Sequence, residues 1–270
     1  MEQFLDIFAG RTALAIAHPG HELRVFGWMQ RAKPLVLVLT DGSGGRSSSR
    51  LASTERIMRQ TGGRQSGFFG RFPDRQIYQA VLQGNTQLFL NVATEVAHEL
   101  VQNDIEIVVG DAAERAILTH DLWRGVVNRA IGLAEQEMDR PLASFEFSLD
   151  EAIPAAAIPA AFKLELSDAE LQAKISAARS YRELAQEVEA VIASHGEEGL
   201  REETFLHAQS DELLASDHQP PRYELHGERQ VAAGLYSQVV RYQRHVFPIL
   251  RALQSGRERA RNKRQLLEAA

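Results

Sequence analysis

Two histidines, separated by a proline and a glycine, stand where an apolar run gives way to an amphipathic one. The segment Ala17-His18-Pro19-Gly20-His21-Glu22 carries both imidazoles three residues apart. Proline fixes and glycine permits a sharp bend, so both rings can face one point. This spacing suits two ligands of one metal ion. On the residues alone, either histidine could instead cap the following helix or bond to the backbone.

A third histidine, His120, comes much later in the chain and directly precedes Asp121. The chain has no cysteine, so any metal must be held by nitrogen and oxygen ligands. Three histidines suit a catalytic zinc ion, or another divalent metal, that keeps an open position for water. Such a metal lowers the pKa of its water to roughly 7 and polarises a substrate carbonyl.

Short apolar runs alternate with longer periodic ones in the first half of the chain, which is typical of strands joined by crossover helices in a mostly parallel sheet. Strands are expected over 13–17, 34–40 and 105–110, and an amphipathic helix over 21–32. Ligands of such sheets bind beyond the carboxyl ends of the strands. Two further helices are predicted by apolar repeats at Leu88, Val92, Val96 and Leu100 and at Leu122, Val126, Ala130 and Leu133.

The periodicity changes near residue 150, where prolines interrupt any helix. From Ser167 onward the pattern is mainly helical. We therefore expect a metal-site domain over 1–150 and a mainly helical C-terminal region over 151–270 that packs on it. The Gly- and Ser-rich segment 41–50 is expected to form a mobile loop at the carboxyl edge of the sheet.

The overall composition is that of a soluble globular protein, with 44% hydrophobic and 24% charged residues. A net charge of -6 argues against broad electrostatic binding of nucleic acid. No apolar stretch approaches the roughly 18 residues of a membrane span, and the N-terminus lacks the features of a signal peptide. We expect a cytoplasmic protein that acts on a small molecule, and a homo-oligomer is compatible with the sequence.

The segment around His18 resembles the Ala-His-Pro-Asp-Asp-Glu signature of the LmbE/PIG-L family. Leu39-Thr40-Asp41-Gly42 is similar to the family's Leu-Thr-x-Gly, at the end of the second expected strand. The segment 114–121, ERAILTHD, looks like the family's variable third motif, whose closing histidine is a zinc ligand. The stretch from Arg50 to Gly63 resembles the family's Arg/Glu helix and the loop after it.

The second half of the chain is similar to one subgroup of this family. Its matching segments are Lys174-x-x-Ala-Ala-x-x-x-Tyr181, Tyr223-Glu224-Leu225-His226-Gly227-Glu228, Gly234-Leu235-Tyr236 and Arg241-Tyr242-x-x-His245. The resemblance thus covers most of the chain. It implies a Rossmann-like sheet, a zinc ion and hydrolysis of an N-acyl group, usually an acetyl group on an amino sugar or related polyol.

The resemblance implies His18, His21 and His120 as the metal ligands. His21 takes the place of an aspartate ligand of the family. An imidazole in place of a carboxylate removes one negative charge, so the metal would be a stronger Lewis acid.

The family's general base is the first aspartate of its signature, and this chain has Gly20 there. A carboxylate from elsewhere could take the proton: Glu114 is favoured, and Asp121, Asp41 and Glu22 are the other candidates. Alternatively, metal-activated water attacks without a protein base. Glu114 could also be an ordinary solvated residue.

The family's oxyanion-stabilising histidine corresponds to Ile117, so that donor must also come from elsewhere. Arg50 and His226 are candidates for it, and together with Asp41 they are the candidate substrate-binding residues. Arg50 could equally be a surface arginine. His226, with Glu228, Tyr236 and His245, could instead form a network that packs and caps the C-terminal helices.

The leading hypothesis is a zinc-dependent deacetylase-like hydrolase that cleaves an N-acyl group from an amino sugar or related metabolite. One alternative is a non-catalytic relative that binds a sugar or metabolite, because Gly20 and Ile117 stand where catalytic groups are expected. Another is a hydrolase with the same metal site that acts on an ester, carbamoyl or glycosidic bond.

Overall fold

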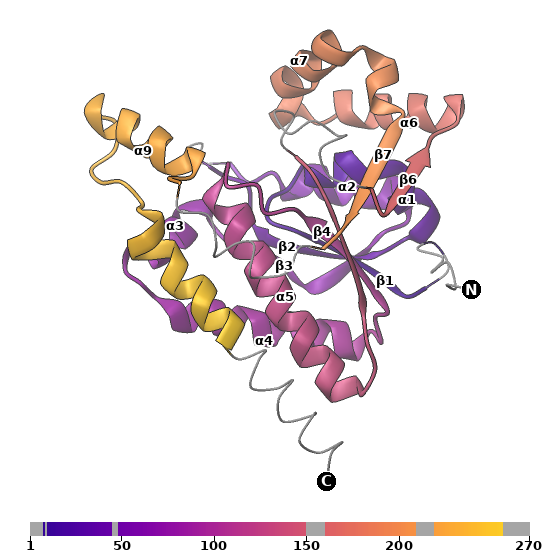
Figure 1. Cartoon of the computed structure of the whole chain (residues 1–270). Helices are drawn as coiled ribbons and strands as arrows, with labels where there is room; N and C mark the ends of the chain where they lie inside the picture. Colours follow the sequence, from indigo (N-terminus) through magenta and orange to yellow (C-terminus); the bar gives the residue numbers. More distant parts are fainter. Residues whose placement is uncertain (1–7, 9, 45–47, 150–159, 209–218, 256–270) are drawn as a thin grey trace. The chain divides into compact units, whose positions relative to one another are not determined.

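A computed structural model describes residues 8, 10–44, 48–149, 160–208 and 219–255. Figure 1 draws these residues in colour along the sequence. They form two compact units built from interleaved segments. The first unit comprises the described residues up to Pro73, Ile105–Asp111 and Ala143–Ala208. The second comprises Asp74–Asp104, Ala112–Leu142 and the described residues beyond Gln209.

The first unit contains one seven-stranded sheet in the order β3-β2-β1-β4-β5-β7-β6. The first five strands of this order, from β3 through β2, β1 and β4 to β5, pair in parallel. Strand β7 is antiparallel to both of its neighbours. The predicted α/β class with a mostly parallel sheet is confirmed. The bounds are β1 Thr12–Ile16, β2 Leu35–Thr40, β3 Arg64–Phe72, β4 Ile107–Asp111, β5 Ala143–Phe147, β6 Phe162–Glu165 and β7 Glu202–His207.

The three strands expected from apolar runs correspond to β1, β2 and β4. The remaining four were not assigned, and two of them, β6 and β7, lie within 151–270, the region expected to be mainly helical. Both edge strands are irregular or short. Strand β3 shifts register twice against β2, between Val36 and Val38 and again between Val38 and Thr40, and β6 has only four residues.

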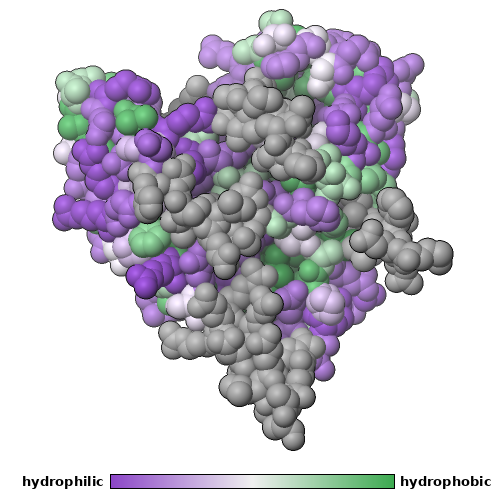
Figure 2. All heavy atoms as spheres, viewed as in Figure 1, coloured by the Kyte–Doolittle hydropathy of each residue, from purple (hydrophilic) through white to green (hydrophobic). Residues whose placement is uncertain are grey.

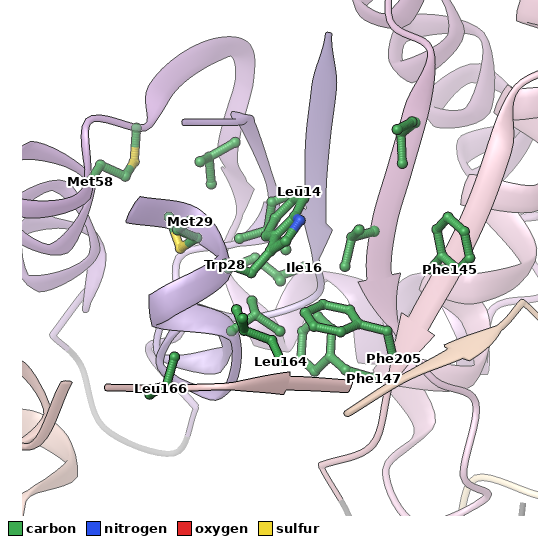
Figure 3. Packing of buried hydrophobic residues seen from close by; sticks show 14 of the residues in the cluster. Leu14, Ile16, Trp28, Met29, Met58, Phe145, Phe147, Leu164, Leu166 and Phe205 are labelled. Atoms are coloured by element: carbon green, nitrogen blue, oxygen red, sulfur yellow. The ribbon is translucent and has the colours of Figure 1, made fainter. Parts of the chain in front are cut away.

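One face of the sheet packs against helices of the same unit. These are the 3-10 turn η1 (His21–Val25) with α1 (Phe26–Ala32), α2 (Leu51–Thr61) and α6 (Asp168–Arg179). Figure 3 shows Trp28 and Met29 of α1 beside Leu14 and Ile16 of β1. Trp28 also lies 6.0 Å, ring centre to ring centre, from Phe205 of β7. Two shorter elements, η2 (Arg182–Leu184) and α7 (Ala185–His195), follow α6, and η3 (Glu197–Leu200) precedes β7.

A buried ion pair holds the start of α1. The amides of Gly27 and Trp28 each donate to the Glu203 carboxylate at 2.8 Å. The Lys174 ammonium of α6 lies 2.9 Å from the same carboxylate and also donates to the Arg24 carbonyl. The first amides of a helix have no partner within it, so this carboxylate on β7 satisfies them and neutralises the lysine.

The second unit is helical. It contains α3 (Asp74–Leu82), α4 (Thr86–Gln102), α5 (Leu118–Met138), α9 (Arg222–Ala232) and the π-helical turn η4 (Tyr242–Val246). The predicted apolar repeats of α4 and α5 are confirmed, because Val92, Val96, Leu122 and Val126 are all buried. The two helices pack against each other.

Outside the atoms drawn in grey, the surface seen in Figure 2 is mostly hydrophilic, with scattered apolar spots. The large hydrophobic side chains that the described part of the chain exposes are all in the second unit: Tyr78, Ile117, Leu225, Leu235 and Tyr236. None of the helices within the described ranges is both long and apolar enough to cross a membrane. Of the segment expected to form a mobile loop, residues 45–47 lie outside the described residues, as do 150–159 of the proline-containing stretch.

Candidate functional site

The order of the strands creates a switch point between β1 and β4. The chain runs from β1 outward to β2 and β3, then returns to the other side of β1 with β4. In open parallel sheets, ligands bind beyond the carboxyl ends of the two strands at such a point. His18 and His21 follow β1, and Asp111 ends β4. The two histidines thus lie where a ligand site is expected, and a carboxylate that was not foreseen joins them.

The turn that carries the histidines depends on glycine. Gly20 has φ 110° and ψ -22°, a backbone conformation that other residues rarely adopt. Its amide donates to Oε2 of Glu22 at 2.6 Å, which closes the turn from inside. The result brings the rings of His18 and His21 together, with centroids 5.3 Å apart and planes at 82°. The helix expected over 21–32 therefore begins with the tight turn η1 before α1.

Hydrogen bonding assigns the tautomer of His18. The Thr40 hydroxyl donates to the Ala17 carbonyl at 3.1 Å, which uses its only hydrogen. The same oxygen lies 2.8 Å from Nδ1 of His18, and with its hydrogen on the Ala17 carbonyl it accepts from the tautomer that carries the proton on Nδ1. Nε2 is then the nitrogen with a lone pair, and the one at which His18 would bind a metal ion.

Asp111 assigns the tautomer of His21 in the same way. Its Oδ2 lies 2.8 Å from Nδ1 of His21 and also accepts the Ala17 amide at 2.7 Å. A carboxylate accepts but does not donate, so Nδ1 of His21 carries a proton, and in the neutral ring Nε2 has the lone pair. The Asp111 side chain is fully buried, whereas that of His21 is 15% exposed. A carboxylate behind a metal-binding histidine is a recurrent arrangement in metalloproteins.

Sequence reasoning missed Asp111 because it was centred on the histidines and ended the third strand at residue 110. A signal was present: an aspartate directly follows the buried run Ile107-Val108-Val109-Gly110. Carboxylates at the carboxyl ends of parallel strands are candidates for a site on position alone.

Glu22, a candidate base, is fully buried. Burial raises its pKa, although contacts with Thr54 and the backbone amides of the turn favour the ionised form. Its Oε2 is occupied by the Gly20 amide. Glu22 thus holds the turn that presents the two histidines.

Asp41 and Arg50 meet at the loop after β2. Asp41 accepts the Ser43 amide at 2.9 Å through Oδ1, and its carbonyl accepts the Arg50 amide at 2.9 Å. Nε of Arg50 donates to the Gly42 carbonyl at 2.6 Å. Two of the three candidate substrate-binding residues therefore shape this loop. The helix α2, expected from the Arg50–Gly63 resemblance, begins directly after Arg50.

The second unit holds His120 and Asp121, in the first turn of α5, and both are buried. Oδ1 of Asp121 accepts the Arg115 amide at 3.0 Å. Oδ2 is buried and has no hydrogen-bond partner among the described residues. Burial, with a smaller contribution from the Glu114 carboxylate, raises the pKa of Asp121 to about 7 against the opposing effect of Arg115.

Glu114 is half-buried in the segment between β4 and α5. The next residue, Arg115, has a left-handed backbone with φ 54°, and its guanidinium lies 4.6 Å from the ring centre of Tyr242. The Arg115 carbonyl accepts the Arg222 amide at 2.8 Å, which ties this segment to the start of α9.

His226 belongs to α9 and lies 6.4 Å, ring centre to ring centre, from Tyr236. Arg241 contacts the carboxylates of Glu224, at 3.0 Å, and of Glu228. Nδ1 of His245 accepts the Arg241 amide at 2.8 Å. These contacts involve residues of the packing and capping network that is the alternative interpretation, and the His226 side chain is exposed, so its role as a substrate contact stays a prediction.

The donors of the candidate site suit a divalent metal only in part. His18 and His21 offer two nitrogen ligands with assigned lone pairs, which fits zinc. Within the described ranges, no three or more His, Asp or Glu side chains form a ready metal-binding group. His120 is in the second unit, so the three-histidine site stays a prediction.

No protein-family model matches this chain, and no curated protein matches it. Among solved structures, it is similar to the conserved protein TT1542 from Thermus thermophilus, at 19% identity and a TM-score of 0.53, over 74% of this chain and 95% of that one. It is also similar to a triple mutant (Orf2*T) of a deacetylase involved in the teicoplanin biosynthetic pathway, at 16% identity and a TM-score of 0.50, over 71% of this chain and 88% of that one. These likenesses concern the fold, and they agree with the mostly parallel α/β sheet.

Proposed function

We propose that this protein is a metal-dependent hydrolase that removes an N-acyl group, most simply acetyl, from an amino sugar or related metabolite. His18, His21 and His120 are the proposed ligands of zinc or another divalent metal. The proposal is supported by the resemblance to the LmbE/PIG-L signature and by a fold shared with a deacetylase.

One observation carries the proposal. At the switch point of the sheet, two imidazoles each have Nδ1 2.8 Å from an oxygen, so Nε2 is the nitrogen at which each would bind a metal ion. The hydrogen bond made by one ring nitrogen sets which nitrogen can bind a metal ion, and both rings lie at the edge of the sheet where ligands bind. The metal, when bound, would polarise the acyl carbonyl and lower the pKa of water.

The chain's own residues then move one proton. Water oxygen bonds to the acyl carbon, the carbon–nitrogen bond breaks, and the proton taken from water is delivered to the leaving amine. We propose Asp121 as the residue that holds this proton, because its Oδ2 is buried and without a hydrogen-bond partner among the described residues. Glu114, which is more exposed, is the alternative carrier. Arg50 and Asp41 are proposed to order the loop that contacts the substrate, and His226 remains a proposed substrate contact.

Metal content tests the proposal. Elemental analysis of the purified protein should find about one zinc per chain, and His18→Ala, His21→Ala and His120→Ala should each lose most of it. His98→Ala, which removes an exposed histidine of α4, should not change the zinc content. Acetate release from N-acetylated amino sugars should accompany the metal. Protein that binds no zinc even when zinc is supplied would exclude the hydrolase proposal.

A second candidate is a non-catalytic relative that binds a sugar or metabolite. The observation that favours it is the backbone of Gly20, whose φ of 110° disfavours any side chain where the family's base stands. It predicts ligand binding without turnover. Turnover that co-purifies with the protein and disappears in His18→Ala would exclude it. Product analysis would separate amide cleavage from cleavage of an ester, carbamoyl or glycosidic bond.

A further inference from the structure

The most unusual feature of the ligand set is that an imidazole stands where the resembled family has a carboxylate. Replacing that carboxylate by neutral His21 would remove a negative charge from the metal. The structure places a carboxylate behind this imidazole, at the end of another strand. Oδ2 of Asp111 is 2.8 Å from Nδ1 of His21, at the end of β4.

We infer that Asp111 is a positioning residue that orients His21 toward the metal and restores, from behind the imidazole, the negative charge that a carboxylate ligand would supply. This inference rests on the proposed function, because it gives His21 a metal to bind. A buried carboxylate that accepts from Nδ1 fixes the ring and makes Nε2 a more basic donor. The gain in Lewis acidity expected from losing the aspartate ligand is thereby offset.

Three observations support the assignment. The Asp111 side chain is fully buried, so solvent does not screen its charge from His21. The same oxygen accepts the Ala17 amide at 2.7 Å, which anchors the carboxylate to the residue before His18. The parallel pairing of Ala15 with Gly110 brings Asp111, the next residue, level with the end of β1.

The test measures zinc affinity by competition with a chromophoric chelator. Asp111→Asn keeps an oxygen for the Ala17 amide and for Nδ1 of His21 but removes the charge. It should weaken zinc binding about 10- to 100-fold. The matched control is Glu106→Gln. Glu106 lies just before the start of β4 and forms an ion pair with Arg11. This variant also removes one carboxylate, and it should bind zinc like the wild type.

A second background separates positioning from a merely structural role. In His21→Asp, the ligand carries its own charge, and a second carboxylate at Asp111 has no imidazole to orient. Asp111→Asn should then leave zinc affinity unchanged or increase it. If Asp111 only supports the backbone through Ala17, the loss would be the same in both backgrounds, and the inference would be wrong.

Nitrogen-15 NMR of the metal-free protein at pH 8.5 gives a readout that does not depend on metal. His21 should be the Nδ1-protonated tautomer in the wild type, and Asp111→Ala should convert it to a mixture of tautomers. If Asp111→Ala does not fold, Asp111→Asn and the zinc measurement still decide. Equal zinc affinity in wild type and Asp111→Asn overturns this inference alone, whereas a wild type that binds no zinc overturns the proposed function as well.

Discussion

Leu184 packs so closely over Gly20 that a Cβ atom added to the glycine would overlap Cδ1 of the leucine. The ring of Tyr181 closes the same space, with Cζ 3.7 Å from that Cβ position. Both the backbone at residue 20 and the side chains around it are therefore arranged for a glycine. The family that this chain resembles has its general base at this position, so a substitution of Gly20 alone does not recreate the site of that base.

Restoring the aspartate should accordingly fail. Gly20→Asp is expected to lower the free energy of unfolding by about 1–3 kcal/mol, from the strained φ alone, and to give no gain in turnover. Urea denaturation would measure the loss. Leu184→Ala in the same chain should relieve the overlap but not the backbone strain. Gly84→Asp is the control, since Gly84 has φ +64° but open space around its Cβ position. A stable and more active Gly20→Asp would contradict this expectation.

The ion pair of Lys174 and Glu203 gives an asymmetric prediction. Burial lowers the pKa of Lys174, and the Glu203 carboxylate opposes that change. Removing one member of a buried pair costs about 3–5 kcal/mol. Glu203→Gln should lower the free energy of unfolding more than Lys174→Met. The carboxylate accepts hydrogen bonds from two amides of α1, whereas the ammonium, besides the ion pair, donates to the Arg24 carbonyl.

Urea unfolding of the two single variants and of the double variant would measure these costs. The double variant should be more stable than the sum of the single losses predicts, because neither charge is then left alone. Additive losses would show that the two side chains do not interact.

His245 predicts a pH dependence of stability. Burial lowers its pKa below 6.5, and the charge of Arg244 adds to this effect. The folded state therefore binds fewer protons than the unfolded state near pH 6.5, so stability falls as the pH drops below that value. Protonation at Nδ1 would also break the bond from the Arg241 amide.

The comparison is with His245→Asn, which keeps an acceptor for the Arg241 amide but does not titrate. Between pH 7.5 and pH 5, the wild type should lose stability relative to this variant. Parallel stability curves for the two proteins would refute the assignment.

The two candidate proton carriers, Asp121 and Glu114, are distinguished by the effect of each substitution on kcat. If Asp121 holds the proton, Asp121→Asn should reduce kcat by about 10²- to 10⁴-fold with zinc content unchanged, and Glu114→Gln should have a small effect. The reverse result would assign the role to Glu114. Full activity in both variants would favour attack by water without a protein base.

The parts of the fold that sequence predicted are those encoded by uninterrupted apolar runs. Strands β1, β2 and β4 are continuous buried segments, and α4 and α5 show clear helical repeats. Strand β7 was not predicted, because Glu203, a carboxylate, occupies one of its buried positions. Strand β3 was missed because its glycines and register shifts break the alternation of a strand.

For the candidate site too, local sequence signals could be interpreted and long-range contacts could not. His18 and His21 could be paired from sequence, because the bend that joins them is local. Asp111 could not, because it meets His21 from 90 residues away through the register of β1 on β4. Lys174 and Tyr181 were noticed only through the resemblance. The structure gives each a physical role, since Lys174 neutralises Glu203 and the Tyr181 hydroxyl lies 3.0 Å from that of Thr54.

The two strands at the rims of the sheet also bear on how the protein behaves at high concentration. A long, regular edge strand offers its free amides and carbonyls to any other chain, and cross-β aggregates grow in this way. β3 is bulged against its neighbour, and β6 is only four residues long, with Lys163 and Glu165 exposed. Neither rim is a good template for a foreign strand. The two edge strands, β3 and β6, thus protect the sheet against edge-to-edge aggregation.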